Sequence, residues 1–151
     1  MPKEKSAGAI IYRLKDNVVY YLLLHYRSGH WEFARGHIEE GEDEKQTVKR
    51  EVEEETGIKD LHIDDIFKEH TKFVFKRTYN LKPEDKKKAP WVFKVVTLYL
   101  AQTQTEEVKI SDEHIGFEWL PYEKAFKKLT YKPAKEAFKK ANDYLVSTKG
   151  I

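Results

Sequence analysis

Three glutamates near the middle of the chain, Glu51, Glu54 and Glu55, have a spacing that suits metal binding or acid–base chemistry. At about 100° per residue they lie within an arc of roughly 100° on one turn of a helix, and Glu53 points away from them. Carboxylates this close repel one another, and the helix dipole disfavours acids in the last turn. A solvated acidic face is one interpretation, although it leaves this placement unexplained. A hard divalent cation such as Mg²⁺ would remove the repulsion, because it prefers carboxylate oxygens as ligands.

These glutamates belong to an acidic segment, Gly36–Ile58, with the sequence GHIEEGEDEKQTVKREVEEETGI. The segment holds nine carboxylates and three lysines or arginines, in a chain whose net charge is +2. Arg50 can pair with Glu54 one turn later or reach back to Glu42, and so brace the loop against the helix. The carbonyl of Gly36 offers a further oxygen to a cation. Mg²⁺ usually binds phosphate oxygens as well, so the segment points to a phosphate-bearing substrate.

The spacing within the acidic segment resembles the Nudix box, G-x5-E-x7-R-E-U-x-E-E-x-G-U, in which U is aliphatic. Every position of that pattern is met, by Gly36, Glu42, Arg50, Glu51, Val52, Glu54, Glu55, Gly57 and Ile58. Membership of the Nudix hydrolase family would imply a sandwich of helices and sheet. It would also imply Mg²⁺-dependent cleavage of a nucleoside diphosphate linked to another group, with Mn²⁺ as a possible substitute.

Three further stretches resemble one branch of that family, the asymmetric diadenosine tetraphosphate hydrolases. WEFARGHIEEGE is similar to the W-x-x-P-K-G-H-x-E-x-G-E sequence that leads into the box, SDEHIGFEWLPYEKA (111–125) to an S-x-E-H-x-x-Y-x-W-L segment, and SAGAIIYR to the first strand. Ala34 replaces the usual proline and Arg35 the usual lysine, and arginine also binds phosphate well. The charged stretch at 80–90 has no counterpart in the pattern.

By this resemblance, the metal ligands are the Gly36 carbonyl, Glu51, Glu54, Glu55 and Glu113. The same four glutamates, together with Arg50, form the predicted catalytic set, in which Arg50 braces the box. An aligned water needs a base to take its proton. Either a glutamate of the box or an acid outside it serves. For the outside acid we choose Glu113, because SDEH matches the pattern. Glu118 is the second choice, and it could equally be a strand residue that faces water.

Five residues are predicted to contact the substrate by the same resemblance. Arg35 and His37 flank the first glycine of the box and could meet phosphates, although a histidine in a surface loop is the other interpretation of His37. Phe73 falls where the family branch places an aromatic ring against adenine, and core packing competes with that role. Tyr131 and Lys132 precede the last helix, where a Tyr-Lys pair meets the nucleotide in related hydrolases. A solvated amphipathic surface is the alternative there.

Hydrophobic and turn patterns indicate the elements that must position these residues. Alternation and β-branched or aromatic runs predict strands, and Pro133 suits the first turn of a helix. The order of elements favours an α+β fold with a mixed central sheet flanked by helices, an α/β/α sandwich of Nudix type with a two-helix C-terminal segment. The predicted strands are 6–14, 18–26, 31–34, 65–79, 91–102 and 116–120, the predicted helices 43–56, 122–129 and 133–147, and the predicted loops 36–42 and 80–90.

Composition limits the remaining possibilities. A chain of 151 residues fits one domain, 1–151, and the absence of cysteine leaves only oxygen and imidazole as metal ligands. No run approaches roughly 18 apolar residues, and no secretory signal is evident, so we expect a cytoplasmic protein that does not bind membranes. We expect a nucleotide as small-molecule substrate, and a monomer or weak dimer. Trp31 and Trp91 are predicted to be packing residues.

The function predicted is Mg²⁺-dependent hydrolysis of dinucleoside polyphosphates, with diadenosine tetraphosphate cut to ATP and AMP. Other Nudix activities stay open: hydrolysis of RNA 5′ ends, of nucleotide sugars or of nucleoside triphosphates. A nucleic-acid partner is expected only for the RNA alternative, because the net charge is small. A nucleotide-sensing module that binds without cleaving is a third possibility, and the intact acidic residues argue against it.

Overall fold

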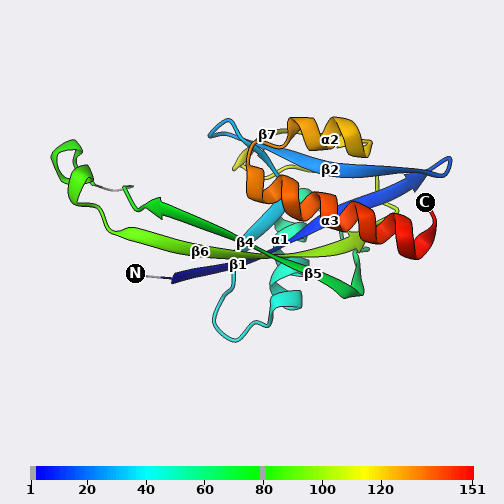
Figure 1. The fold of residues 1–151 in the computed structure, drawn as a ribbon, viewed down its shortest axis with the longest axis horizontal. Coiled ribbons are helices and arrows are strands. Elements are labelled where there is room, and N and C mark those ends of the chain that lie inside the picture. The colour runs from blue at the N-terminus through cyan, green and yellow to red at the C-terminus, as the bar shows by residue number, and fades with distance from the viewer. Residues whose placement is uncertain (1–2, 79–80) are drawn as a thin grey trace.

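The computed structural model describes residues 3–78 and 81–151, and its centre is a seven-stranded sheet (Figure 1). Five strands form the path β3-β2-β1-β6-β5, while β4 pairs with β1 and β7 pairs with β2. The strands are β1 (Lys3–Lys15), β2 (Val18–Tyr26), β3 (Trp31–Glu32), β4 (Ala34–His37), β5 (His62–Lys76), β6 (Trp91–Gln102) and β7 (His114–Leu120).

The sheet is mixed, because β1 and β6 run parallel and the other pairs run antiparallel. Seven consecutive residues of β1, Ser6 to Tyr12, are buried. Such a continuous run indicates a strand that is covered on both faces, in contrast to the alternation of a half-exposed strand.

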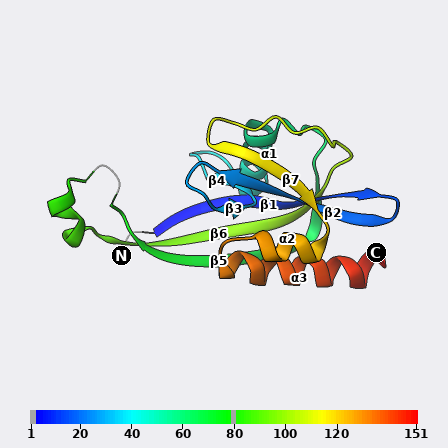
Figure 2. The same ribbon diagram turned by 90° about the horizontal axis from the view of Figure 1, so that it is seen from above.

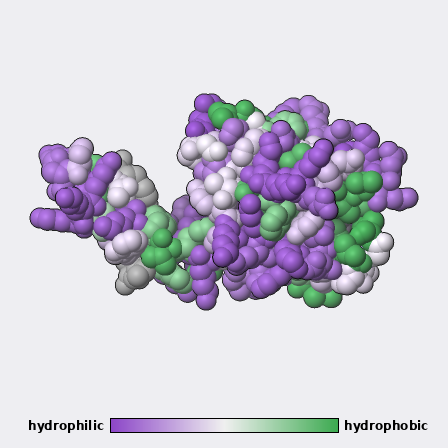
Figure 3. All heavy atoms as spheres, turned by 45° about the horizontal axis from the view of Figure 1, so that its top comes forward, coloured by the Kyte–Doolittle hydropathy of each residue, from purple (hydrophilic) through white to green (hydrophobic). Residues whose placement is uncertain are grey.

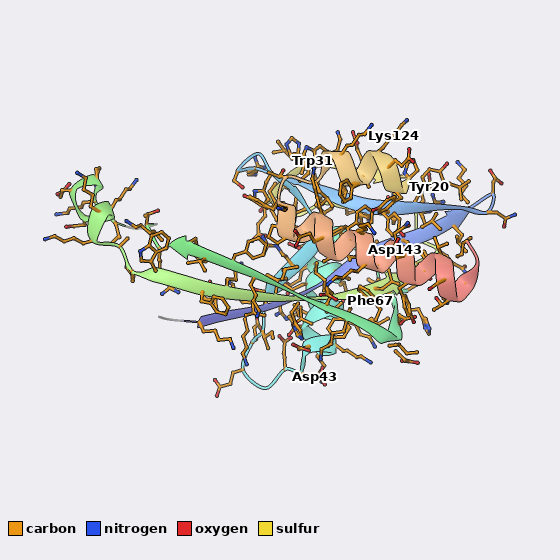
Figure 4. The ribbon with its side chains drawn as sticks, viewed as in Figure 1. Tyr20, Trp31, Asp43, Phe67, Lys124 and Asp143 are labelled. Carbon is orange, nitrogen blue, oxygen red and sulfur yellow. The ribbon has the colours of Figure 1, made fainter. Side chains whose placement is uncertain are left out.

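Helices cover both faces of the sheet (Figure 2). The helix α1 (Glu44–Thr56) packs on one face, and α2 (Tyr122–Lys128) and α3 (Lys132–Lys149) pack on the other. The core is accordingly divided into two clusters. Val48 and Val52 of α1, which are one helical turn apart, are fully buried in the first cluster. Phe67 of β5 belongs to the second cluster and lies against Tyr144 of α3 (Figure 4).

The ends of α1 follow from local sequence. The side chain of Asp43 accepts a hydrogen bond from the Gln46 amide, and the Gln46 side chain accepts one from the Asp43 amide, which is a capping box. Gly57 ends the helix in the left-handed conformation, with φ of 77°. The helix predicted at 43–56 is therefore confirmed, and its ends fix where the glutamates of the last turn lie.

The strand predicted at 31–34 is divided in two. Trp31 and Glu32 pair with β2, whereas Ala34 to His37 pair with β1. Gly36 and His37 thus end a strand, and the prediction of a loop that begins at Gly36 is wrong. The two glycines of this stretch suggest a loop, but pairing with the distant strand β1 makes Ala34–His37 extended.

The ends of β5 and β6 project together from the rest of the sheet and form an arm, which we define as the described residues 74–78 and 81–93 (Figures 1 and 2). Pro83–Lys88 form the 3-10 helix η1 within the predicted loop at 80–90. The strand predicted at 65–79 spans His62–Lys76. Tyr79 and Asn80, the end of that predicted strand and the start of that loop, lie outside the described residues.

The predicted fold class is confirmed: a mixed sheet between helices, closed by two helices at the C-terminal end. The last strand begins two residues before the predicted range, at His114, and α3 begins one residue before Pro133. In the described part of the chain, no helix has the length and apolar character needed to cross a membrane.

Candidate active site

The backbone of Gly36 lies directly against the carboxylate of Glu51. A Cβ atom added to Gly36 would be 2.0 Å from the Glu51 carboxyl carbon, so a side chain there would displace the glutamate. The β1–β4 register turns Gly36 toward α1, because its partner Ala7 belongs to the core cluster beneath that helix. A strand and a helix therefore meet at this glycine, with a backbone and a carboxylate in close approach.

Arg50 joins the loop before α1 to the last turns of the helix. Its Nε and Nη2 donate to the two oxygens of Glu42 at 2.7 and 2.9 Å, and Nη2 also donates to the His37 carbonyl at 3.0 Å. Its Nη1 donates to Glu51 at 2.7 Å and to Glu54 at 3.3 Å. The hydrogen bonds of Arg50 lower the pKa of Glu42 to about 2. One guanidinium thus neutralises part of the acidic segment and fixes its shape.

Glu55 differs from its neighbours because it is buried, with 2% of its surface exposed. Its Oε2 accepts a hydrogen bond from the Arg35 amide at 3.1 Å, and its Oε1 accepts one from the Tyr26 hydroxyl at 3.4 Å. Burial raises the pKa of this carboxyl to about 8, and the nearby charge of Glu51 adds to the rise. Burial also raises the pKa of Glu51, although Arg50 opposes the shift. Without a cation, Glu55 is mostly protonated at neutral pH.

His114 adds an imidazole to this cluster. Its Nδ1 is 2.9 Å from the Ser111 hydroxyl, and its Nε2 is 3.6 Å from Oε1 of Glu55. That Nε2 is buried and has no hydrogen-bond partner in the described part of the chain. Glu113 is exposed, and one ligand atom each from Glu55, Glu113 and His114 all lie within 4.8 Å of one another. The donor set is oxygen-rich and contains an unpaired buried nitrogen, so it fits a divalent cation.

A cleft of about 440 Å³ begins at Glu51 and Glu113 and extends across the sheet. Arg35 and His37 of β4 and Lys94 of β6 line it. Strand register places these three cationic or imidazole side chains on the same face, the face that α3 covers farther along. The cleft thus has carboxylates at one end and positive charge beside them, which suits a polyphosphate flanked by a metal ion.

Aromatic rings lie beside two residues of the cleft lining, Arg35 and His30. The ring of Tyr131, before α3, lies 6.2 Å from the ring of Phe73 and 5.4 Å from that of His30, measured between centroids. The Arg35 guanidinium lies 5.7 Å from the Phe73 centroid. Tyr26 stacks on His30 at 4.5 Å. Flat apolar surfaces beside cations are what a nucleobase with a phosphate chain requires.

Comparisons with known proteins agree with this geometry. A family model described as the NUDIX domain matches residues 2–141. The chain belongs to the Nudix family of pyrophosphohydrolases. Nudix hydrolases depend on divalent metal ions, and a nucleotide is their typical substrate.

Two relatives of this Nudix chain are the asymmetrical bis(5′-nucleosyl)-tetraphosphatases of Sus scrofa and Mus musculus. The first is 30% identical over an alignment of 155 positions, which covers 95% of this chain and 96% of the relative. The second is 29% identical over 156 residues, which span 95% and 97%. Among solved structures, a Caenorhabditis elegans Ap4A hydrolase in a binary complex superposes with a TM-score of 0.77 at 28% identity and covers 95% of this chain and 98% of that one. The Escherichia coli dihydroneopterin triphosphate pyrophosphohydrolase shares the fold, with a TM-score of 0.72 at 19% identity over 93% of this chain and 97% of that one.

The structure of this Nudix protein brings together most of the residues singled out in the sequence. Two groups meet in or beside the cleft. The first consists of the predicted metal ligands Gly36, Glu51, Glu55 and Glu113. The second consists of the predicted substrate contacts Arg35, His37, Phe73 and Tyr131. Glu54 is exposed and contacts Arg50. Lys132 is exposed, and in residues 3–78 and 81–151 its side chain has no hydrogen bond or ion pair.

Glu118, the second choice for an outside base, lies elsewhere. Its carboxylate pairs with Lys128 of α2 at 3.1 Å, and α2 packs on the face of the sheet away from α1. The strand period explains this placement, since each step along β7 changes the face to which a side chain points.

Residues of the cleft and of the candidate metal group escaped the sequence predictions, among them Tyr26, His30 and Lys94 of the cleft and His114 of the metal group. A signal existed for two of them. Lys94 is a lone cation inside the apolar run WVFKVVTLYL, and His114 directly follows Glu113 in SDEH. Tyr26 and His30 are brought to the site by the turn after β2. In this turn the Tyr26 amide donates a hydrogen bond to the His30 carbonyl.

Proposed function

We propose that this Nudix protein hydrolyses dinucleoside polyphosphates in the presence of Mg²⁺, and cuts diadenosine tetraphosphate to ATP and AMP. The observation that supports the proposal most is the continuity of one cleft. Glu51 and Glu113 line it together with Arg35, His37 and Lys94, and the rings of Phe73 and Tyr131 lie near the Arg35 and His30 side chains of that lining. Two relatives that align with 95% of this chain carry the name asymmetrical bis(5′-nucleosyl)-tetraphosphatase, which is consistent with a polyphosphate in this cleft.

The metal ligands in this proposal are the Gly36 carbonyl, Glu51, Glu54, Glu55 and Glu113. Bound Mg²⁺, or Mn²⁺ in its place, would neutralise phosphate charge and lower the pKa of a bound water. Arg50 holds Glu51 and Glu54 through Nη1, so both carboxylates are already gathered on one side of the helix. The Arg35 amide and the Tyr26 hydroxyl hold Glu55 in a fixed orientation.

Glu113 is the proposed general base. It is the exposed member of the carboxylate group and lines the cleft, so it can approach a water beside a phosphorus atom. The water oxygen forms a bond to phosphorus while the bond from phosphorus to the bridging oxygen breaks. Glu113 takes the water proton, and the departing phosphate leaves as the terminus of one nucleotide product.

Substrate orientation falls to the remaining cleft residues. Arg35 and Lys94, with His37 beside them, face the phosphate chain. Phe73 and Tyr131 would hold an adenine ring between a strand and the start of α3. Lys132, which follows Tyr131 at the first turn of α3, would contact the outer phosphates.

Product analysis tests this proposal directly. The purified protein is incubated with diadenosine tetraphosphate and Mg²⁺, and the nucleotides are separated by ion-exchange chromatography. ATP and AMP in equal amounts are expected. Two molecules of ADP as the only nucleotide products, or the absence of turnover, would contradict it.

A substrate panel distinguishes the other Nudix activities. Triphosphorylated RNA, a nucleotide sugar and a nucleoside triphosphate are compared with the dinucleotide under the same conditions. We expect the dinucleotide to have the highest kcat/KM. A value at least about tenfold higher for another substrate would reassign the site, and ligand binding without cleavage of any compound would indicate a sensing module.

A further inference from the structure

The arm, residues 74–78 and 81–93, stands clear of the body of the molecule (Figure 3). The first described residue of β1, Lys3, pairs with Phe93, so the described sheet beyond this point consists of β5 and β6 alone. A two-stranded ribbon has marginal stability in water unless another surface covers it. At its base the arm is tied to β1 by an ion pair between Arg77 and Glu4.

One face of the arm exposes apolar and aromatic surface. Trp91 is 52% exposed and Val74 is 54% exposed, and strand register places both on the same face as Lys76. The Lys76 ammonium lies 5.2 Å from the centroid of the Trp91 ring. The prediction that Trp91 is a packing residue is therefore wrong, because the described pairing of β1 with β6 reaches only as far as Phe93.

The tip of the arm carries a concentration of positive charge. Lys82, Lys86, Lys87 and Lys88 are exposed, and none forms an ion pair with any described residue. Glu84 and Asp85 are the acids of η1. The lysines are thus available to a polyanion from outside the molecule.

We propose that the arm binds single-stranded nucleic acid, with Trp91 as a stacking platform and the lysines of η1 as phosphate contacts. Exposed aromatic rings with flanking cations are how proteins bind single strands without sequence preference. A membrane fits the arm less well, because its tip, PEDKKK, is polar, and the more exposed apolar side chains, Val74 and Trp91, lie on its strands.

This surface is separate from the hydrolytic cleft. Trp91 and Lys94 are three residues apart on β6, so their side chains point to opposite faces, and Lys94 faces the cleft. Binding to the arm therefore does not require the dinucleotide site, and the inference goes beyond the proposed hydrolysis.

Fluorescence anisotropy with a fluorescein-labelled 15-nucleotide single-stranded RNA, and with DNA of the same sequence, tests the proposal. The variant carrying Lys86→Ala, Lys87→Ala and Lys88→Ala is expected to bind at least about tenfold more weakly. The slope of log K against log salt should fall in magnitude by about 2, as expected for three lost contacts to a single strand. Trp91→Ala should weaken binding about tenfold with little change in the slope.

The matched control removes the same charge from the other end of the molecule, with Lys124→Ala, Lys127→Ala and Lys149→Ala. It should bind RNA as the unaltered protein does, and all the variants should retain the dinucleotide hydrolysis and melting temperature of that protein. Absence of RNA binding at about 50 mM salt, or an equal loss in the control, would overturn the proposal. The proposal would also be overturned if sedimentation analysis showed a dimer of the unaltered protein that the triple lysine variant does not form. Hydrolysis measured in parallel separates failure of the arm proposal from failure of the proposed hydrolysis.

Discussion

The acidic segment and the arm are both dense in charge, but their charges are held in opposite ways. In the acidic segment, Arg50 contacts Glu42, Glu51 and Glu54, and Glu55 is buried beneath the strand that carries Arg35. In the arm, the lysines of η1 point into solvent and form no ion pair with a described residue. Carboxylates that neighbouring residues hold in place can position a metal ion and a substrate. The unpaired lysines of the arm, in contrast, are free to bind a negatively charged partner.

Replacing Glu55 should have the largest effect, because its carboxylate is buried and oriented. We expect Glu55→Gln to lower kcat for the dinucleotide by about 10³-fold, or about 4 kcal/mol of barrier, through loss of an anionic metal ligand. Glu53→Gln on the exposed side of the same turn is the control and should leave kcat unchanged. Equal activity of the two variants would remove Glu55 from the site.

In the metal-free protein, the buried carboxyl of Glu55 should make the free energy of unfolding depend on pH. The pKa of Glu55 is raised from 4.5 to about 8 by burial, so between these values the folded state binds more protons than the unfolded state. The free energy of unfolding should therefore fall as the pH rises from about 4.5 to about 8, by up to a few kcal/mol. Urea unfolding in a chelator measures it. Glu55→Gln should flatten this slope, and a slope as steep as before would contradict the assignment.

Removal of the central arginine comes next. We expect Arg50→Ala to lower the free energy of unfolding by about 2–3 kcal/mol, because Glu42 and Glu51 lose their charged donor while held near other acids. Lys49→Ala, an exposed neighbour with the same change in charge, should cost less than about 0.5 kcal/mol. Chemical denaturation compares them, and similar losses in both variants would mean that Arg50 does not brace the segment.

A smaller effect is expected for Glu54, the exposed glutamate of the cluster. Saturating Mg²⁺ should raise the melting temperature of the unaltered protein by several degrees, since binding to the folded state alone stabilises it. Glu54→Gln should reduce that rise by about half, and Glu53→Gln should not alter it. An undiminished rise in Glu54→Gln would place the metal elsewhere.

The arm should show the smallest effect on stability. The triple change Lys86→Ala, Lys87→Ala and Lys88→Ala should alter the free energy of unfolding by less than about 0.5 kcal/mol, because these side chains are exposed and unpaired within the described residues. Thermal melting measures the difference. A loss comparable to that of Arg50→Ala would show that the arm lysines stabilise the fold, and the contrast between the two regions would disappear.

The parts of the fold that depend on local signals could be predicted from the sequence. The helix over the acidic segment follows from Asp43, Gln46 and Gly57, all within a few residues of its ends. The box spacing placed three glutamates on one turn, and the structure shows them there. The division of 31–37 into two strands could not be predicted, because it depends on which distant strand each half meets.

The same distinction separates the site residues that were found from those that were missed. Glu51, Glu54 and Glu55 share a local pattern. The approach of His114 to Glu55 joins β7 to α1, and no sequence period connects them. The exposure of Trp91 likewise depends on the register of β6 with β1, whose described pairing reaches only Phe93. Burial of a polar residue against a remote element is a property of the assembled fold.

The parallel pairing of β1 with β6 has a consequence for how the molecule acquires its shape. Lys3 pairs with Phe93 and Tyr12 with Gln102, so the central pair joins residues roughly 90 positions apart. During synthesis, β1 leaves the ribosome long before its partner exists, and the cleft wall that holds Lys94 cannot form until β6 has emerged. Closure of so long a loop favours slow folding, and in the interval the apolar residues of β1 lack the cover of β6 and are open to aggregation.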